Sequence, residues 1–462
     1  MAGRGASVRP FLNPRAARGR FWNPYTQTLP RRALDRIHLE RLRAAIRFAY
    51  DRSPFYRRLL DKAHVHPDQI RTFEDYVKRI PFMDKKEILE AQATDPPYGE
   101  ALMLPREYLF HAFQTSGSVG TPMHIPIPMY NSVLWGEAWN FQFWAIGARP
   151  RDTFYFPFNW GSFAGFWSTY FGIRRFGGTI VSGGGLDTKA RIEQLLRIKP
   201  DVMLATPTYC LYMGEVAKEM GVDLREARVR FMIVSGEPGG SIPIVRQQIE
   251  AIWGSEVHDF YGLAEVGPTC PGCPSGRGVH VAEEFYHSMV VDANGEPVPD
   301  GEVGEHILTS YVQHAQLTVK YRSHDLVRWY RRPCECGTTW IFLEGGVLGR
   351  TDSMVVIRGI NVYPSAVSAL LGQVHGLTEN YEIHVDCDER SDLVTVKVEA
   401  AREVAPERYG PLRQEAEEVL KRTIGVTIGI EVLSPQALPR YELKARRFFD
   451  HRPPHRKWLI QR

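Results

Sequence analysis

The sequence predicts an α/β fold with a large N-terminal domain and a small α+β C-terminal domain. Three observations support this prediction. In the middle of the chain, short apolar strands alternate with amphipathic helices, as in a parallel sheet covered by helices. Residues 285–345 contain short strands separated by Gly, Pro and Asp turns, which is typical of an antiparallel subdomain. The tail then combines two strands of alternating polarity with one helix.

The N-terminal half begins with expected helices. Residues 34–62 have apolar side chains at helical spacing, and a second helix is expected over 83–93. The alternating region that follows has strands at 201–205, 231–234 and 257–261 and helices over 207–220 and about 242–252. Because these strands are apolar throughout, we expect helices to cover both faces of a parallel sheet.

The second half changes character twice. Antiparallel strands are expected at 289–291, 303–309, 326–330 and 339–343. Further along, 394–398 and 426–432 alternate in polarity around a helix at 409–422. The predicted division is a flexible tail over 1–20, a large domain over 21–348 and a small domain over 349–462.

Composition narrows the functional class. The 462 residues are 44% hydrophobic and 24% charged, which excludes a wholly disordered chain. A net charge of +4 is too small to indicate a nucleic-acid partner. No apolar stretch reaches the roughly 18 residues of a membrane span, so a soluble protein is expected.

The N-terminus and the cysteines indicate a cytoplasmic setting. Residues 1–20 carry five arginines and no acid, and they lack the apolar core of a secretory signal. A flexible basic tail is the preferred interpretation, with a transit peptide as the alternative. Six cysteines in so long a chain do not make a disulfide scaffold.

A loop rich in hydroxyls and glycines is the clearest candidate for chemistry. Its backbone N–H and side-chain O–H groups suit phosphate oxygens, although no Gly-Lys-Ser/Thr of a Walker loop follows. The alternative is a surface turn. The candidate binding residues are Thr115, Ser116, Gly117, Ser118, Gly120 and Thr121.

Further polar blocks follow predicted strands, where α/β folds place ligand sites. The first is Ser235, Gly236, Glu237 and Pro238, and the second is Tyr261 and Gly262 with Glu265. Later blocks carry Asp325, Arg350 and, near the C-terminus, Lys444.

Taken together and in this order, these blocks resemble those of the adenylate-forming enzymes, most closely the phenylacetate–CoA ligase branch. The resemblance runs from about Phe21 to Asp450 and includes the Pro-Phe-Tyr-Arg segment at 54–57. It implies a barrel-like subdomain within an adenylation domain over 21–348, and a mobile C-terminal domain over 349–462. It also implies ATP, CoA and a small carboxylic acid as substrates.

The resemblance assigns the nucleotide-binding roles. Residues 115–122 would bind phosphates, and the 235–238 block with Tyr261 would flank the adenine. Asp325 would accept hydrogen bonds from the ribose hydroxyls, and Arg350 would lie near the ribose and α-phosphate. The alternatives are that Asp325 is a turn residue and that Arg350 forms an ordinary interdomain ion pair with Asp352.

Two catalytic roles follow from the same resemblance. Glu265 would hold Mg²⁺, a cation that prefers oxygen ligands, and Lys444 would stabilise charge between the carboxylate and α-phosphate. A helix-start carboxylate and a solvated basic residue are the alternatives. Two residues depart from the family pattern: Met123 follows the loop where many relatives have lysine, and Leu443 replaces the glycine that commonly precedes the catalytic lysine.

A second constellation combines three cysteines and a histidine. Cys273, His280, Cys334 and Cys336 suit a closed tetrahedral Zn²⁺ site with a structural role. Cys270 is a competing ligand, because it lies three positions before Cys273. Free buried cysteines are the alternative.

The predicted function is ATP-dependent formation of an acyl-AMP from an aryl or arylacetic acid, followed by transfer to CoA. Aromatic residues over 154–170 suggest the acyl pocket, although a packed core explains many of them equally well. The alternatives are transfer to a carrier protein or an amine, and a non-catalytic nucleotide-binding relative. Whether the chain is a monomer or a homodimer stays open.

Overall fold

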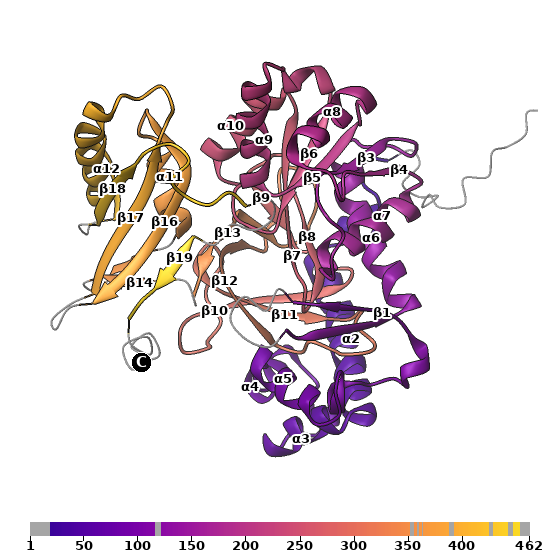
Figure 1. Cartoon of the computed structure of the whole chain (residues 1–462). Coiled ribbons are helices and arrows are strands. Elements are labelled where there is room, and N and C mark those ends of the chain that lie inside the picture. The colour runs from indigo at the N-terminus through magenta and orange to yellow at the C-terminus, as the bar shows by residue number, and fades with distance from the viewer. Residues whose placement is uncertain are drawn as a thin grey trace, which may run out of the picture.

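A parallel sheet forms the centre of the large domain in the computed structural model (Figure 1). The structure describes residues 19–115, 122–351, 355–357, 360–362, 364–387, 392–424, 428–441 and 447–452. The sheet has the order β4-β3-β5-β6-β7-β8, parallel except for the last pair. Its strands are β3 (Thr153–Phe156), β4 (Thr179–Ser182), β5 (Val202–Ala205), β6 (Phe231–Ser235), β7 (Glu256–Leu263) and β8 (Gly267–Pro271).

Helix α6 leads into β3, and the other four helices connect successive strands of this sheet, as the alternation in the sequence predicts. They are α6 (Met129–Ala145), α7 (Ala164–Phe176), α8 (Thr188–Ile198), α9 (Pro207–Met220) and α10 (Pro243–Trp253). Helix α9 begins where predicted because the Thr206 side chain accepts a hydrogen bond from Tyr209 N, and it ends at Gly221, whose φ is +69°. The strand–helix prediction for this region is confirmed.

The antiparallel subdomain is a five-stranded sheet with the order β10-β11-β12-β13-β9. Its strands are β9 (Gly278–His280), β10 (Tyr286–Val291), β11 (Val303–Ser310), β12 (Tyr321–Tyr330) and β13 (Phe342–Arg350). The predicted strand at 339–343 begins only at Phe342, because Thr338 and Thr339 instead donate hydrogen bonds to the Gln27 carbonyl. A separate hairpin joins β1 (Leu109–Gln114) to β2 (His124–Pro128).

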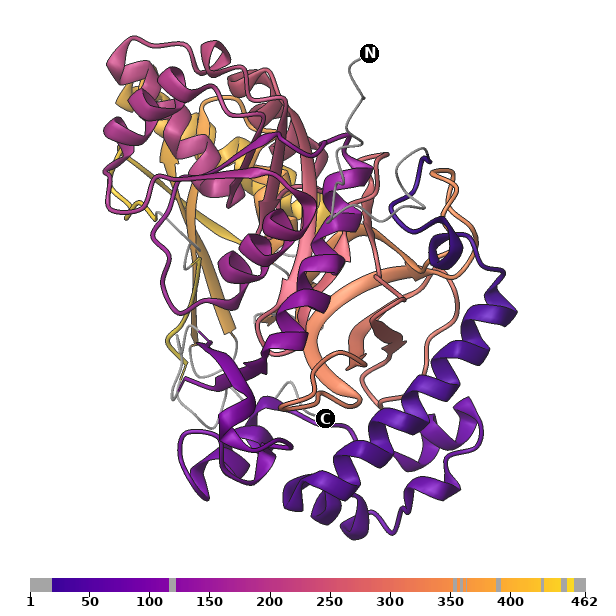
Figure 2. The same cartoon turned by 90° about the vertical axis from the view of Figure 1, so that its right-hand side faces the viewer.

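The N-terminal helices pack beside the antiparallel strands, as Figure 2 shows for α2. They are α1 (Pro24–Gln27), α2 (Arg31–Arg52), α3 (Pro54–Lys62), α4 (Phe73–Arg79) and α5 (Lys85–Ala93). The single helix expected over 34–62 is wrong. The chain breaks at Ser53, because Pro54 has no N–H and favours the first position of a new helix, where Ser53 caps Tyr56 N.

The C-terminal domain has its own sheet, β18-β17-β16-β19, and its own core. Its elements are α11 (Pro364–Leu371), β16 (Leu377–Cys387), β17 (Asp392–Ala400), α12 (Tyr409–Ile424), β18 (Gly429–Leu433) and β19 (Phe448–Asp450). A short pair, β14 (Val355–Ile357) and β15 (Ile360–Val362), precedes them. Strands β17 and β18 are parallel, and α12 lies between them in the chain, in the strand–helix–strand order that the sequence predicts.

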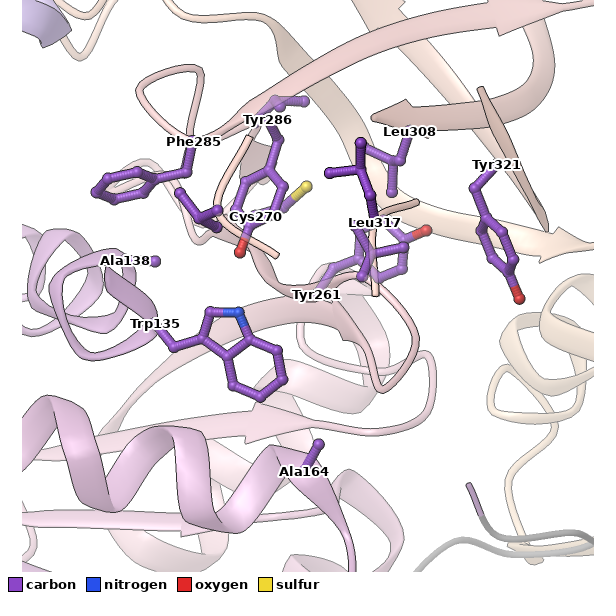
Figure 3. Packing of buried hydrophobic residues seen from close by; sticks show 14 of the residues in the cluster. Trp135, Ala138, Ala164, Tyr261, Cys270, Phe285, Tyr286, Leu308, Leu317 and Tyr321 are labelled. Atoms are coloured by element: carbon purple, nitrogen blue, oxygen red, sulfur yellow. The ribbon is translucent and has the colours of Figure 1, made fainter. Parts of the chain in front are cut away.

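The main core lies between α6, α7 and the two large sheets (Figure 3). Figure 3 shows Tyr261 among its buried residues, which also include Trp135, Cys270 and Tyr286. Tyr261 therefore has its ring in the core, and its hydroxyl contacts Asp325 in the site described next. Among the described residues, no helix is both long and apolar enough to cross a bilayer.

Candidate active site

Three predicted residues meet around one buried carboxylate. The Tyr261 hydroxyl donates to Asp325 Oδ2 at 2.8 Å, and Arg350 Nη1 donates to Asp325 Oδ1 at 2.8 Å. Asp325 on β12 and Arg350 at the end of β13 are direct partners in the sheet register. Tyr261 reaches them from β7, in the other sheet. Asp325 is therefore held by a partner on each oxygen and is only 4% exposed.

The surroundings of Asp325 keep the Tyr261 hydroxyl protonated, so that it can donate to the carboxylate. Burial, followed by the nearby Asp325 charge, raises the pKa of Tyr261 well above its ordinary value, so its hydroxyl stays protonated. The Asp325 backbone N–H also donates to Ser323 Oγ at 3.0 Å. The alternative of Asp325 as a turn residue is wrong, because it lies inside β12.

Glu265 lies in the tight turn between β7 and β8, four positions after Tyr261. The alternative of a helix-start carboxylate is therefore wrong, since no helix begins there. The Gln313 side chain donates to the Glu265 carbonyl at 2.6 Å and fixes the turn. The carboxylate itself is 15% exposed, with Lys85 Nζ 4.0 Å from its Oε1.

Lys85 is a site residue that the sequence analysis missed. It is the first residue of α5, and its Nζ donates to Thr115 Oγ1 at 3.1 Å. Lys85 thus links the start of the predicted phosphate loop to the Glu265 carboxylate. Lys85 is far along the chain from both Thr115 and Glu265, so no motif of fixed spacing in the sequence connects it to them. Asp84, which caps the helix immediately before it, marks only a helix start.

The base of the phosphate loop is closed by Thr115 and Met123. Thr115 N donates to Met123 O, and Met123 N donates to Thr115 Oγ1, both at 3.0 Å. The Met123 side chain is fully buried and supplies no cation. Ser116, Gly117, Ser118, Gly120 and Thr121 lie outside the described residues, as do Asp352 and Lys444.

The 235–238 block lies beside Tyr261, because Ser235 ends β6 and pairs with Phe260 on β7. Gly236 adopts a φ of +94°, which favours glycine. Glu237 turns back to the start of α9, where its Oε1 accepts from Thr208 N at 2.8 Å and from the Thr208 hydroxyl. Gly262 is exposed next to Tyr261.

The cysteines and histidine of the second constellation come together. Their four ligand atoms lie within 4.8 Å of one another, from Cys273, His280, Cys334 and Cys336. Cys273 Sγ and Cys334 Sγ are 3.8 Å apart, and Cys336 Sγ is 3.3 Å from His280 Nε2. A tetrahedron with Zn–S of about 2.3 Å separates two sulfurs by about 3.8 Å, so the geometry fits zinc.

Cys270 is not part of this cluster. It faces the main core, and burial raises the pKa of its thiol, so it stays protonated. Within the cluster, hydrogen bonding with Cys336 is the largest cause that lowers the pKa of the Cys273 thiol. The cluster therefore favours a thiolate, the form that ligates metal, whereas Cys270 does not.

The aromatic residues over 154–170 divide into two groups. Phe154, Phe156 and Phe158 are buried in the core. Trp160 and Trp167 are half-buried, with ring centroids 5.3 Å apart, and their indole N–H groups donate to Ser182 Oγ and Gly161 O. The half-buried group also includes Phe163, Phe166 and Tyr170, so these five are the aromatic side chains of this segment that are partly open to solvent.

Comparison with known proteins identifies the family. Residues 55–314 match the family described as AMP-binding enzyme, and residues 359–452 match its C-terminal domain. The chain belongs to the AMP-binding enzyme family. It is 32% identical to the phenylacetate-coenzyme A ligase of Thermus thermophilus, over 93% of this chain and 99% of that protein. It is 30% identical to the phenylacetate-coenzyme A ligase of Aromatoleum evansii, over 90% of this chain and 94% of that protein.

Solved structures of this AMP-binding family also indicate the domain arrangement. The chain is similar to 2-hydroxyisobutyryl-CoA ligase in the postadenylation state with 2-HIB-AMP, with a TM-score of 0.89, 29% identity, and coverage of 94% and 93%. The same ligase in the thioesterification state gives a TM-score of 0.72 over 94% and 93%. The whole chain therefore superposes better on the postadenylation structure of that ligase than on its thioesterification structure. The predicted family, fold class and ligase class are confirmed.

Proposed function

We propose that this chain is an AMP-forming acid–thiol ligase that activates an aryl or arylacetic carboxylate and transfers it to CoA. The observation that carries the proposal is the Tyr261–Asp325–Arg350 arrangement, in which a buried carboxylate is oriented on both oxygens. A carboxylate oriented in this way suits a diol, whose two hydroxyls can donate hydrogen bonds to it. His324, next to Asp325, contacts Asp84 at 3.0 Å, and Lys85, next to Asp84, contacts Thr115 and lies 4.0 Å from the Glu265 carboxylate. These neighbouring groups together suit ATP.

The nucleotide roles follow from this placement. Asp325 accepts hydrogen bonds from the ribose, and Arg350 faces the ribose and α-phosphate. The 115–122 loop binds the phosphates through its N–H and O–H groups. Lys85 adds an ammonium at the base of that loop, where Met123 supplies no charge. The 235–238 block flanks the adenine.

Glu265 is the residue that would hold Mg²⁺. Its carboxylate is partly exposed and no arginine contacts it among the described residues, which suits a cation bound by one carboxylate and by substrate phosphates. Bound there, Mg²⁺ would neutralise charge on the triphosphate. Lys85 stands 4.0 Å from the same carboxylate and would share the phosphate oxygens.

Lys444 is assigned to the adenylation step, where its ammonium stabilises charge between the carboxylate and the α-phosphate. Forming a mixed anhydride with AMP gives the carboxylate a leaving group that a thiol can displace. The division into an adenylation domain over 21–348 and a mobile domain over 349–462 lets the second domain serve each half-reaction in turn.

The class of carboxylic acid substrate is inferred from the aromatic side chains of the suggested acyl pocket. The half-buried Trp160 and Trp167 suit an aromatic ring. The named relatives differ, since some are phenylacetate ligases and one is a 2-hydroxyisobutyryl-CoA ligase. Their shared acceptor is CoA, which favours CoA over a carrier protein or an amine.

A structural zinc in the cysteine–histidine cluster completes the proposal. Three sulfurs and one imidazole leave no open position, so the ion would not take part in the chemistry. The match of the 3.8 Å sulfur separation to a tetrahedral zinc site supports it.

Pyrophosphate release tests the proposed function. Purified protein is incubated with ATP, Mg²⁺ and phenylacetate, benzoate or 2-hydroxyisobutyrate, with and without CoA. We expect fastest release with an aromatic acid and a thioester product only when CoA is present. Release without thioester would favour another acceptor, and no release with any acid would contradict the ligase assignment.

A further inference from the structure

Helix α9 has two different faces. One face is buried in the large domain through Tyr209, Cys210, Met213, Val216 and Ala217. The opposite face carries polar residues at intervals of four, three and four positions, which places them in one stripe. They are Thr208, Glu215 and Glu219, with Tyr212 between them, whose ring also packs against the core. This polar face looks toward the C-terminal domain, which lies beside α9 and α10 in Figure 1.

Two arginines of the C-terminal domain pair with acids on this polar face. Arg402 forms an ion pair with Glu219, and Arg440 Nη2 lies 3.5 Å from Glu215 Oε2. All four side chains are partly exposed, so each pair is weak by itself. Weak pairs suit an interface that has to form and release during one catalytic cycle.

A third arginine connects the C-terminal domain to the nucleotide-binding block. Arg447 Nη2 donates to Thr208 Oγ1 at 3.3 Å, and Thr208 in turn donates to Glu237. The Arg447 guanidinium is held by the Glu379 carbonyl and lies 4.3 Å from the centroid of the Tyr381 ring. Opposite charges therefore face each other across the interface, with arginines on the small domain and acids on the large one.

Arg440 is positioned by its own domain before it meets α9. It donates to both oxygens of the fully buried Glu399, at 3.0 Å and 2.8 Å. Glu399 also accepts from Leu438 N at 2.6 Å, which fixes the backbone just before Arg440. Because this fork is fixed internally, little side-chain entropy is lost when it approaches Glu215.

The two contacts bracket the catalytic lysine in the sequence. Arg440 lies four positions before Lys444, and Arg447 lies three positions after it. Both arginines, and so the described chain on either side of Lys444, contact the same helix. The whole chain superposes better on the postadenylation structure of 2-hydroxyisobutyryl-CoA ligase than on its thioesterification structure, and the postadenylation state is next to the step that Lys444 serves.

We propose that the polar face of α9 is the platform on which the C-terminal domain docks for adenylation, with Thr208, Glu215 and Glu219 as positioning residues for Lys444. The proposal rests on the function proposed above, in which Lys444 serves only the first half-reaction. Contacts that form only in this orientation favour acyl-AMP formation and contribute nothing to thioester formation.

The first test separates the half-reactions. Glu215→Lys turns an attraction to Arg440 into repulsion, and Glu193→Lys, on the exposed side of α8, is the matched control. We expect Glu215→Lys to lower pyrophosphate release with phenylacetate at least fivefold. Conversion of supplied phenylacetyl-AMP and CoA should stay within twofold of the parent rate. An equal fall in both half-reactions, or no fall in either, would overturn the proposal.

The second test measures docking without turnover. In a Glu219→Cys/Arg402→Cys variant, disulfide formation in oxidised glutathione reports how often the two domains meet. Adding Glu215→Lys should slow this reaction at least fivefold, and adding Glu193→Lys should not. If crosslinking does not respond to Glu215→Lys, docking on α9 is disproved. If it responds but no acid supports pyrophosphate release, the docking inference stands and the proposed function fails.

Discussion

Replacing Asp325 by asparagine isolates the proposed ribose contact. The side chain keeps its shape but loses its charge, and its amide can offer an oxygen to only one of Tyr261 and Arg350, which now contact separate oxygens at 2.8 Å each. A hydrogen bond to a charged group is worth about 1.5–3 kcal/mol, and 1.4 kcal/mol is tenfold, so kcat/KM for ATP should fall roughly 10- to 100-fold.

The assay is pyrophosphate release with phenylacetate as the ATP concentration is varied, repeated with 2′,3′-dideoxy-ATP. In the parent enzyme, replacing ATP by the dideoxy nucleotide should lower kcat/KM about as much as Asp325→Asn does. In the variant it should cost little, because the two changes remove the same interaction. The thermal unfolding midpoint provides the control for folding. A dideoxy penalty that is unchanged in Asp325→Asn would refute the assignment of Asp325 to the ribose.

Three other predictions concern the zinc content, the contribution of Lys85 to ATP binding, and the stability at acidic pH. Purified protein should contain about one zinc per chain by elemental analysis, and Cys334→Ser should lower the unfolding midpoint more than kcat; zinc-free protein prepared without chelators would contradict this. Lys85→Met should raise KM for ATP about tenfold through loss of a charged phosphate contact, whereas Lys86→Met, at an 82% exposed side chain, should not. Burial lowers the pKa of His287 and of His306 to about 3, below the ordinary value of 6.5. Below pH 6.5 the unfolded chain therefore binds more protons than the folded one. The free energy of unfolding decreases as the pH is lowered from about 6.5 toward 3, and at pH 5 each histidine has cost roughly 2 kcal/mol. Urea unfolding at pH 7 and pH 5 checks this, and equal stabilities would contradict it.

Most of the fold could be predicted from the sequence, because the patterns that indicate strands and helix starts lie within short segments of the chain. Apolar strands followed by Pro207 and Pro243 give helix starts that need no tertiary information. The errors arose where distant contacts decide the structure. Thr339 leaves the expected strand because its hydroxyl donates to carbonyls near the N-terminus, at Gln27 and Leu29. A sequence window around 339–343 contains no trace of those partners.

The site was predictable to the extent that its residues lie in compact blocks. Tyr261, Asp325 and Arg350 belong to such blocks, but the contacts among them depend on two sheets meeting. Lys85 belongs to no block. Only the packing of α5 brings it to Thr115 and Glu265, so a charged residue that resembles any other helix-start lysine escaped notice.

The cysteine–histidine cluster lies where the chain passes from one sheet of the site to the other. Cys273 follows β8, His280 ends β9, and the other two cysteines lie between β12 and β13. The cluster thus joins the chain beyond β7, which carries Tyr261, to the hairpin that carries Asp325. The contact between those two residues is also fixed by the ladders of their own sheets. Loss of the metal should therefore first weaken the junction of the sheets, and so the stability, while the ribose contact and the chemistry persist at permissive temperature.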